Sequence, residues 1–332
     1  MKRLRKFFVV ALLLLVAAAA AGWWWLGRPL PLRGERVEIS IEPGTTPREV
    51  VRLWVDAGVD APPELLYQWF RWSGQARKIR AGSYEIGTGT TPRDLLDKMV
   101  RGDEVLENLR LIDGWTFRQV RQALVDAPNL KQSIQGLTDE QVAKMLELPG
   151  GVVEGHVFPD TYAYSRGVSD MTVLRRAVAA MTRRIDEAWP TRAEGLPLPN
   201  PEAALVLASI VEKETGTPGD RGRVAAVFVN RLKLGMPLQS DPTVIYGLGT
   251  KFDGNLRRVD LTTDTPWNTY TRAGLPPTPI SMPGLASLQA VLKPDPSKAL
   301  YFVARGDGSS VFSDTLDDHN RAVNQFQKGP RK

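Results

Sequence analysis

A long apolar run close to the N-terminus constrains this chain more than any other feature. Residues 7–26 read FFVVALLLLVAAAAAGWWWL, twenty residues without a charge. A helix of this length crosses the roughly 30 Å hydrocarbon core of a bilayer. The three tryptophans stand at one end of the run, where aromatic side chains meet the membrane–water boundary. The run therefore predicts a transmembrane helix over residues 7–26, with a basic tail over residues 1–6.

The basic residues around this run indicate its orientation. Four of them lie among residues 1–6 and one, Arg28, follows, so most of the net charge of +6 is next to the membrane. The denser cluster favours a cytoplasmic N-terminus, with the bulk of the chain in the periplasm behind a cell inner membrane. Beyond Arg28 the charges nearly balance, which argues against nucleic-acid binding. A cleaved signal peptide is the alternative, but the run continues past its alanines through three tryptophans, and we favour a retained anchor.

The residue types that are scarce exclude several kinds of site. The chain has no cysteine, so disulfides and thiolate zinc sites are impossible. Its two histidines, His156 and His319, are far apart; this excludes a His-rich metal centre and makes a Ser-His-Asp site a poor explanation. We expect no metal and no cofactor. The 332 residues, 42% of them apolar, suffice for two folded domains.

An internal repeat marks a small domain behind a Pro-rich linker at residues 27–35. PGTTPREVVRLW at 43–54 recurs as TGTTPRDLLDKM at 88–99. Each copy predicts a helix with a threonine N-cap, Thr46 or Thr91, and a capping box, and a short alternating strand precedes each copy. Such strand–helix units resemble LysM modules, which bind glycans that contain N-acetylglucosamine. We expect a LysM-like subdomain over residues 36–104; the alternative is one good capping box used twice.

The remainder, residues 105–330, reads as a larger domain of the α+β class. Helical periodicity predicts helices over these stretches: 116–126, 137–147, 170–188, 201–215, 220–234 and 284–292. Strands are expected at 299–304 and 310–313. Loops rich in Pro, Thr and Gly fill residues 236–284, and loops of such length in a compact domain are usually functional.

Two glutamates end the most apolar of these helices, in LASIVEKETG at 207–216. Three- and four-residue spacing places Glu214 on one face with Ile210 and Val211, and Glu212 on nearly the opposite face. The two therefore cannot form an acid–nucleophile pair. Burial and the helix C-terminus both raise a carboxyl pKa, so Glu214 is the candidate general acid, with Glu212 flanking it. The alternative is a helix end whose glutamates are solvated.

Hydrogen-bonding and aromatic side chains gather downstream of this helix. They are Gln239, Asp241, Thr243, Tyr246, Asn268, Thr269 and Tyr270. Sugar chains present hydroxyls and apolar ring faces, so this mixture suits a glycan. We predict that these seven residues bind substrate, although ordinary turn chemistry explains each of them singly.

Five motifs carry a resemblance to a known family. In chain order they are EGHVFPDTY, ASIVEKET, QSDPTVIYG, NTYTRAGLPPTPISMPG and YFVARGDG. Together they resemble the YceG-like family of membrane-anchored endolytic murein transglycosylases, and the anchor and the LysM-like region fit as well. The resemblance implies that the second glutamate of EKE, Glu214, is catalytic. Glu154 and Asp160 of the first motif and Glu212 are expected to support it, and Ser240 stands where the family often has threonine.

The resemblance also implies the reaction and its setting. We expect cleavage of the β-1,4 bond between N-acetylmuramic acid and N-acetylglucosamine in nascent peptidoglycan, with formation of 1,6-anhydro-N-acetylmuramic acid, which ends strand elongation. The expected partners are glycan strands and the peptidoglycan synthases of the elongation or division machinery. A lysozyme-type hydrolase that uses Asp241 or Glu212 as a second carboxylate is the enzymatic alternative. A membrane-tethered, non-catalytic glycan-binding or scaffold protein is the other.

Overall fold

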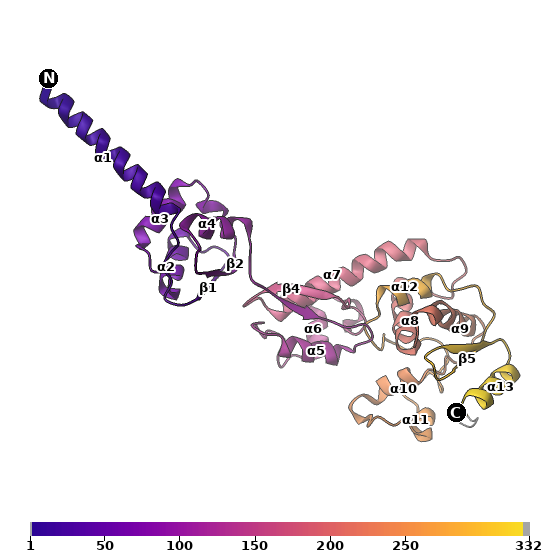
Figure 1. Ribbon diagram of the computed structural model, residues 1–332. Coiled ribbons are helices and arrows are strands. Elements are labelled where there is room, and N and C mark those ends of the chain that lie inside the picture. The colour runs from indigo at the N-terminus through magenta and orange to yellow at the C-terminus, as the bar shows by residue number, and fades with distance from the viewer. Residues whose placement is uncertain (1, 328–332) are drawn as a thin grey trace. The chain divides into compact units, whose positions relative to one another are not determined.

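The computed structural model describes residues 2–327, with side chains from Arg5 onward, and divides into two compact units. Unit 1 runs to Glu107 and includes Ala163–Val168; unit 2 consists of Asn108–Tyr162 and the chain from Ser169 onward. Helices and short two-stranded sheets make up both units (Figure 1), which confirms the α+β class. Met1 of the expected basic tail and residues 328–330 of the expected larger domain lie outside the described residues.

Unit 1 contains a long helix, an antiparallel strand pair and three shorter helices. The elements are α1 (Lys2–Leu26), β1 (Arg36–Ile41), α2 (Pro47–Ala57), α3 (Pro63–Trp72), β2 (Gly82–Gly87) and α4 (Pro92–Arg101). The chain then continues through β3 (Leu106–Arg110), which forms a two-stranded sheet with β4 (Thr161–Ser165).

Helix α1 contains the apolar run and is long and apolar enough to cross a membrane. The candidate span is Arg5–Leu26, with a mean hydropathy of 2.3, and none of it is buried within the protein. A core helix would be covered by other elements, so this exposure fits either a membrane anchor or a signal sequence.

The segment expected to be a linker, residues 27–35, is instead packed into unit 1. Leu30 is 4% exposed and belongs to the unit's core, and its amide donates to the carbonyl of Thr90 at 2.8 Å. Leu32 forms a bridge with Val59. The prolines at 29 and 31 favour an extended chain, and the segment packs on the unit with Leu30 buried and Leu32 half-buried. The Pro-rich segment predicted to be a linker is therefore packed against unit 1.

The two copies of the internal repeat are brought together by the strands that precede them. The strands before them, β1 and β2, pair antiparallel, with Arg36 opposite Gly87 and Ile41 opposite Gly82. Both predicted N-caps are confirmed, since Thr46 and Thr91 cap α2 and α4 with complete capping boxes. The repeat therefore encodes two halves of one unit.

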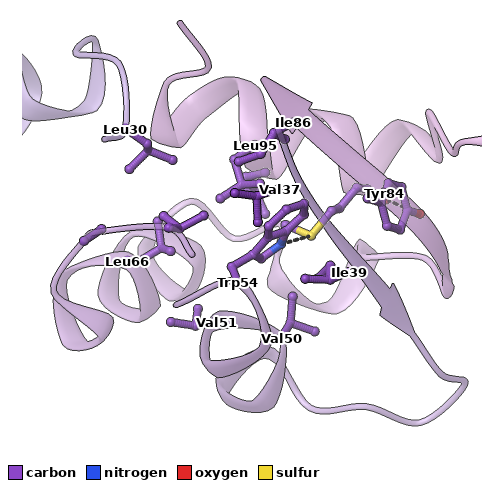
Figure 2. Packing of buried hydrophobic residues seen from close by; sticks show 14 of the residues in the cluster. Leu30, Val37, Ile39, Val50, Val51, Trp54, Leu66, Tyr84, Ile86 and Leu95 are labelled. Atoms are coloured by element: carbon purple, nitrogen blue, oxygen red, sulfur yellow. Dashed lines mark hydrogen bonds between the residues drawn. The ribbon is translucent and has the colours of Figure 1, made fainter. Parts of the chain in front are cut away.

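The core of unit 1 forms between the inner face of this sheet and the helices (Figure 2). Val37 and Ile39 of β1, and Tyr84 and Ile86 of β2, are all at most 6% exposed. Trp54 of α2 is fully buried among them, and its indole N–H donates to the sulfur of Met99 at 3.3 Å.

Unit 2 is mostly helical. Its elements are α5 (Phe117–Asp126), α6 (Asp139–Met145), α7 (Asp170–Ala188), α8 (Pro201–Glu214), α9 (Arg221–Lys233), α10 (Asp241–Leu248), α11 (Arg258–Thr262), α12 (Leu285–Leu292), β5 (Tyr301–Ala304), β6 (Ser310–Ser313) and α13 (Leu316–Phe326). Every helix and strand expected in this region is present, with ends that differ by a few residues. The loop expected over residues 236–284 is only partly a loop, because α10 and α11 lie within it.

Helix α8 lies at the centre of the unit 2 core. It packs against α9, α12, α7 and α10, and the ribbon shows α8, α9 and α12 gathered together (Figure 1). The antiparallel hairpin β5–β6 pairs Tyr301 with Ser313 and packs against α9 through Phe302 and Phe228, whose rings meet edge to face.

Candidate active site

The site is built at the C-terminal end of α8. Asn200 caps the helix by accepting from the amide of Ala203 at 2.9 Å, and Pro201 follows at the first helical position. Every residue from Ala204 to Val211 is buried. Because the helix is covered all round, it has no single buried face, and both glutamates at its end are sheltered.

Glu212 faces the start of α12. Its side chain is 8% exposed, and its Oε2 accepts from the amide of Gly284 at 3.0 Å. The guanidinium of Arg221 lies 3.7 Å from its other oxygen. Burial, and then the nearby charge of Glu212, raise the pKa of Asp113 above its usual range. Glu212 thus belongs to a charge cluster within the protein.

Glu214 faces a different set of groups. Its Oε1 accepts a hydrogen bond from the hydroxyl of Ser240 at 2.7 Å. Burial raises the pKa of Glu214 to about 7; the Ser240 bond opposes this rise, the charge of Asp241 adds to it and that of Arg231 opposes it. A carboxyl with this pKa is protonated in a large fraction of molecules near neutral pH, and can donate a proton and then take one back.

A groove of about 540 Å³ opens beside Glu214. The side chains along it are polar and aromatic as well as aliphatic, and come from α8, α9, α10, β5, α13 and the loops before α10 and after α11. They include Glu214, Arg231, Gln239, Asp241, Tyr270, Tyr301, Phe302, Leu316 and His319. A larger hollow of about 720 Å³ between α7, α9 and α12 is lined by none of the predicted site residues.

Three of the predicted substrate-binding residues line this groove, namely Gln239, Asp241 and Tyr270. The phenol of Tyr270 donates to Asp241 Oδ1 at 2.5 Å, which joins the start of α10 to the loop that follows α11. These side chains are free to meet a ligand, because Gln239 and Asp241 are exposed and Tyr270 is half-buried.

The other four predicted substrate-binding residues are not among the side chains that line the groove. Thr243, Asn268 and Thr269 are at most 2% exposed and bond to neighbouring backbone or to each other; the Asn268 amide, for instance, donates to the carbonyl of Thr263 at 2.7 Å. The ring of Tyr246 meets that of Trp267 edge to face. Thr243 and Thr269 bond to Ser240, and Asn268 bonds to the amide of Tyr270, so these buried residues support the loops that carry the groove lining.

The expected supporting acids are spread over unit 2. Glu154 is 7% exposed and accepts from the amide of Phe117, at the start of α5, with both oxygens, at 3.0 and 3.1 Å. Burial raises the pKa of Glu154 to about 7, against the bond from Phe117. Asp160 is exposed and accepts from the amide of Thr161. Neither lines the groove.

Four residues of the site were missed by the sequence reasoning. Ser240 touches Glu214 directly. Arg231 is 8% exposed, donates to the carbonyls of Leu300 and Leu238, and lines the groove with Tyr301 and His319, whose rings stack at 5.2 Å. The helix that carries Arg231 also contains Arg221 and Arg223, so its sequence does not single out the arginine that is buried. The stacked pair gave no signal in the sequence.

Comparison with known proteins identifies the family. The YceG-like family matches residues 39–325, which covers most of both units. The chain belongs to this family. The match includes the five motifs and begins within β1, so the family region takes in most of the strand pair of unit 1 and most of the groove lining.

Proteins of the YceG-like family resemble the chain along most of its length. A Bacillus subtilis protein named endolytic murein transglycosylase is 30% identical over 307 residues, 87% of this chain and 84% of that protein. A Streptococcus pneumoniae protein of the same name is 27% identical over 322 residues, 86% of this chain and 58% of that protein. The crystal structure of a YceG-like protein from Listeria monocytogenes aligns with a TM-score of 0.55 and 28% identity, over 86% of this chain and 99% of that one.

Proposed function

We propose that this chain is an endolytic murein transglycosylase that cleaves the bond between N-acetylmuramic acid and N-acetylglucosamine in nascent peptidoglycan and so ends strand elongation. The observation that carries the proposal is Glu214, a sheltered carboxyl with a pKa raised to about 7, beside a groove with polar and aromatic walls. The names of the relatives support the same activity.

In the proposed reaction one carboxyl does both proton transfers. Protonated Glu214 gives its proton to the glycosidic oxygen as the bond from C1 of the muramyl sugar breaks, so that N-acetylglucosamine leaves with a free 4-hydroxyl. The carboxylate then takes the proton of the muramyl C6 hydroxyl as its oxygen bonds to C1. A 1,6-anhydro end forms, no water is consumed and Glu214 regains its proton. General acid–base help of this kind contributes about 10²–10⁴-fold.

A lysozyme-type hydrolase is the enzymatic alternative, since ordinary glycoside hydrolysis uses two carboxyl groups. The contacts of Glu212 with Gly284 and Arg221 leave it no part in the groove. Asp241 does line the groove, with one oxygen bonded to Tyr270, and is therefore the residue that hydrolysis would require. A non-catalytic glycan-binding or scaffold protein is the second alternative, but it gives no role to a sheltered carboxyl that lines the groove and is oriented by Ser240.

The experiment is product analysis on uncross-linked nascent glycan strands, with the full chain purified in detergent. Mass spectrometry of the new ends separates all three functions. Anhydro ends, lighter by one water than reducing ends, are the expected result. New reducing ends would establish hydrolysis, and binding without cleavage would establish a scaffold.

We also propose that α1 is a single-pass anchor in the inner membrane, with a cytoplasmic N-terminus and both units in the periplasm. The length and exposure of the apolar span support this. Because the chain has no cysteine, a Thr88→Cys variant gives one thiol at an exposed turn. A membrane-impermeant maleimide added to spheroplasts, which lack the outer membrane, should label it. Protection of that thiol would place unit 1 in the cytoplasm, and an intact mass without α1 would establish a cleaved signal sequence.

Unit 1 is proposed as a LysM-like glycan-binding unit, and peptidoglycan synthases as protein partners. The paired repeat and its two capped helices support a compact LysM-like part over residues 36–104, which lies in the chain between α1 and the catalytic unit. Cross-linking in cells followed by mass spectrometry tests the partners, and recovery of no synthase would argue against them.

A further inference from the structure

We propose that Ser240 determines which oxygen of Glu214 carries the proton, and that Thr269 is the positioning residue that holds Ser240 in place to do so. The inference rests on the proposed function, because it gives the catalytic carboxyl a defined orientation. Neither residue was expected in this role, and both lie in motifs that also supply Gln239, Asp241 and Tyr270 to the groove.

The Ser240 hydroxyl is buried next to the Glu214 carboxyl. Ser240 is 1% exposed, so its hydroxyl has no water to donate to and needs an acceptor within the protein. In the described part of the chain, the contact found for this hydroxyl is Glu214 Oε1, at 2.7 Å. Ser240 therefore donates to Oε1. When Glu214 is protonated its proton belongs on Oε2, the oxygen left for the substrate.

The hydroxyl groups of Thr243 and Thr269 form a set of hydrogen bonds with the backbone of Ser240. The hydroxyl of Thr243 lies 2.7 Å from the carbonyl of Ser240 and donates its single hydrogen there. Thr243 and Thr269 hydroxyls lie 2.9 Å apart, so Thr269 must be the donor between them. The oxygen of Thr269 is then free to accept from the amide of Ser240, at 3.0 Å. Each threonine hydroxyl thus donates its hydrogen to one acceptor, and neither of them donates to the Ser240 hydroxyl.

The backbone before Ser240 is held in the same way. Gln239 has a φ of +52°, a left-handed conformation that is unfavourable for a residue with a side chain. Its amide donates to the carbonyl of Thr269 at 3.1 Å, and its side-chain oxygen accepts from Arg231 at 3.3 Å. Thr269 thus fixes both the turn at Gln239 and the amide of Ser240, which orients the hydroxyl toward Glu214.

The Ser240 bond affects the ionisation of Glu214 as well as its orientation. The Ser240 bond lowers the pKa of Glu214, against burial, which raises it to about 7. Other titratable or charged groups along the groove are Arg231, Asp241, Tyr270, Tyr301 and His319, and none of them is changed by replacing Ser240 or Thr269. Loss of the bond should therefore raise the pH at which Glu214 loses its proton.

The experiment compares Ser240→Ala and Thr269→Val with wild type, as full chains, over a range of pH. Because a hydrogen bond to a charged group contributes about 1.5–3 kcal/mol, and about 1.36 kcal/mol corresponds to one pH unit, the alkaline limb of kcat should move up by about one to two pH units in both variants. The rate at pH 6 should fall about tenfold or more in Ser240→Ala, because the proton is no longer confined to Oε2. Ser240→Thr and Thr269→Ser keep the hydroxyls and should restore most of the loss.

The matched control is Thr138→Val, which removes a hydroxyl that caps α6 and should lower stability without moving the pH profile. Infrared difference spectra against Glu214→Gln follow the Glu214 carboxyl without any turnover, so this readout stands even if wild type makes no anhydro product. A carboxyl signal that titrates at the wild-type pH in Ser240→Ala would overturn the proposal for Ser240. A lower melting temperature with an unmoved pH profile in Thr269→Val would overturn it for Thr269.

Discussion

Glu212 and Glu214 stand two residues apart at the end of α8, and their carboxyl groups bond to different parts of unit 2. Glu212 accepts from the Gly284 amide, whereas Glu214 accepts from the Ser240 hydroxyl. Both are sheltered, so burial alone does not distinguish them. What distinguishes them is the groove, which Glu214 lines and Glu212 does not.

Glu212→Gln should lower stability modestly and spare the chemistry. The amide oxygen still accepts from Gly284, but the charge opposite Arg221 is lost. We expect a loss of about 1 kcal/mol in unfolding free energy and a kcat within about tenfold of wild type. Thermal unfolding and turnover measured together check this. A loss of kcat as large as that of Glu214→Gln would mean that Glu212 acts in the reaction.

Tyr301→Ala should weaken substrate binding more than it slows the chemical step. Tyr301 lines the groove, stacks on His319 at 5.2 Å from ring to ring, and has the Arg231 guanidinium over its ring, so its truncation removes an aromatic part of the groove wall. Aromatic contacts contribute about 0.5–1.5 kcal/mol, so KM should rise up to about tenfold. Tyr301→Phe keeps the ring and should stay near wild type. A fall in kcat at unchanged KM would contradict a binding role.

Glu154→Gln should make the protein relatively more stable at alkaline pH. Burial raises the pKa of Glu154 from 4.5 to about 7, so the folded state binds a proton that the unfolded state releases. The wild-type stability from this group is complete below pH 4.5 and is lost as pH rises through 7. The glutamine has no such loss, so the difference between variant and wild type should grow by up to about 3 kcal/mol from pH 5 to pH 8.

Glu140→Gln, at an exposed position of α6, is the control for that experiment. It should show the same difference from wild type at both pH values. A pH-independent difference for Glu154→Gln as well would mean that Glu154 ionises normally in the folded chain.

Leu30→Ala should loosen unit 1 locally. Leu30 is 4% exposed within the core (Figure 2), and a buried leucine truncated to alanine costs about 2–5 kcal/mol. Hydrogen exchange should rise in the peptides that contain Thr90 and Val59, the partners of residues 30 and 32. Leu65→Ala, at a side chain 53% exposed on α3, should change little. Equal exchange in both variants would mean that residues 27–35 contribute little to the packing of unit 1.

Local patterns in the sequence predicted the fold where local chemistry decides it. The capping boxes at Thr46 and Thr91 and the cap at Asn200 are formed by residues a few positions apart, so a short window contains the whole signal. Helix α10 was missed although Ser240 and Pro242 mark its start, because its Pro, Thr, Val, Ile and Gly residues are poor helix formers. Its buried residues, Thr243 and Val244, indicate that tertiary packing stabilises it.

Part of the candidate site could be proposed from the sequence, because short motifs contain the residues concerned. Glu214, Gln239, Asp241 and Tyr270 could be found, since the motifs contain them and the groove brings them together. The contact of Ser240 with Glu214 spans 26 residues, and the stack of Tyr301 on His319 depends on how α13 packs on β5. Such contacts leave no periodic trace in a single sequence. The buried Thr243 and Thr269 were assigned to substrate because composition does not reveal which hydroxyls are already bonded.

The most direct test of the account is the product made by wild type and by Glu214→Gln on nascent glycan at pH 6, as full chains with matched melting temperatures. Wild type should generate 1,6-anhydro ends, and the variant should do so at least about 10²-fold more slowly, because the amide has no proton to give to the leaving oxygen. Release of anhydro ends by Glu214→Gln at the wild-type rate would contradict the assignment of Glu214 as the acid and base of the reaction.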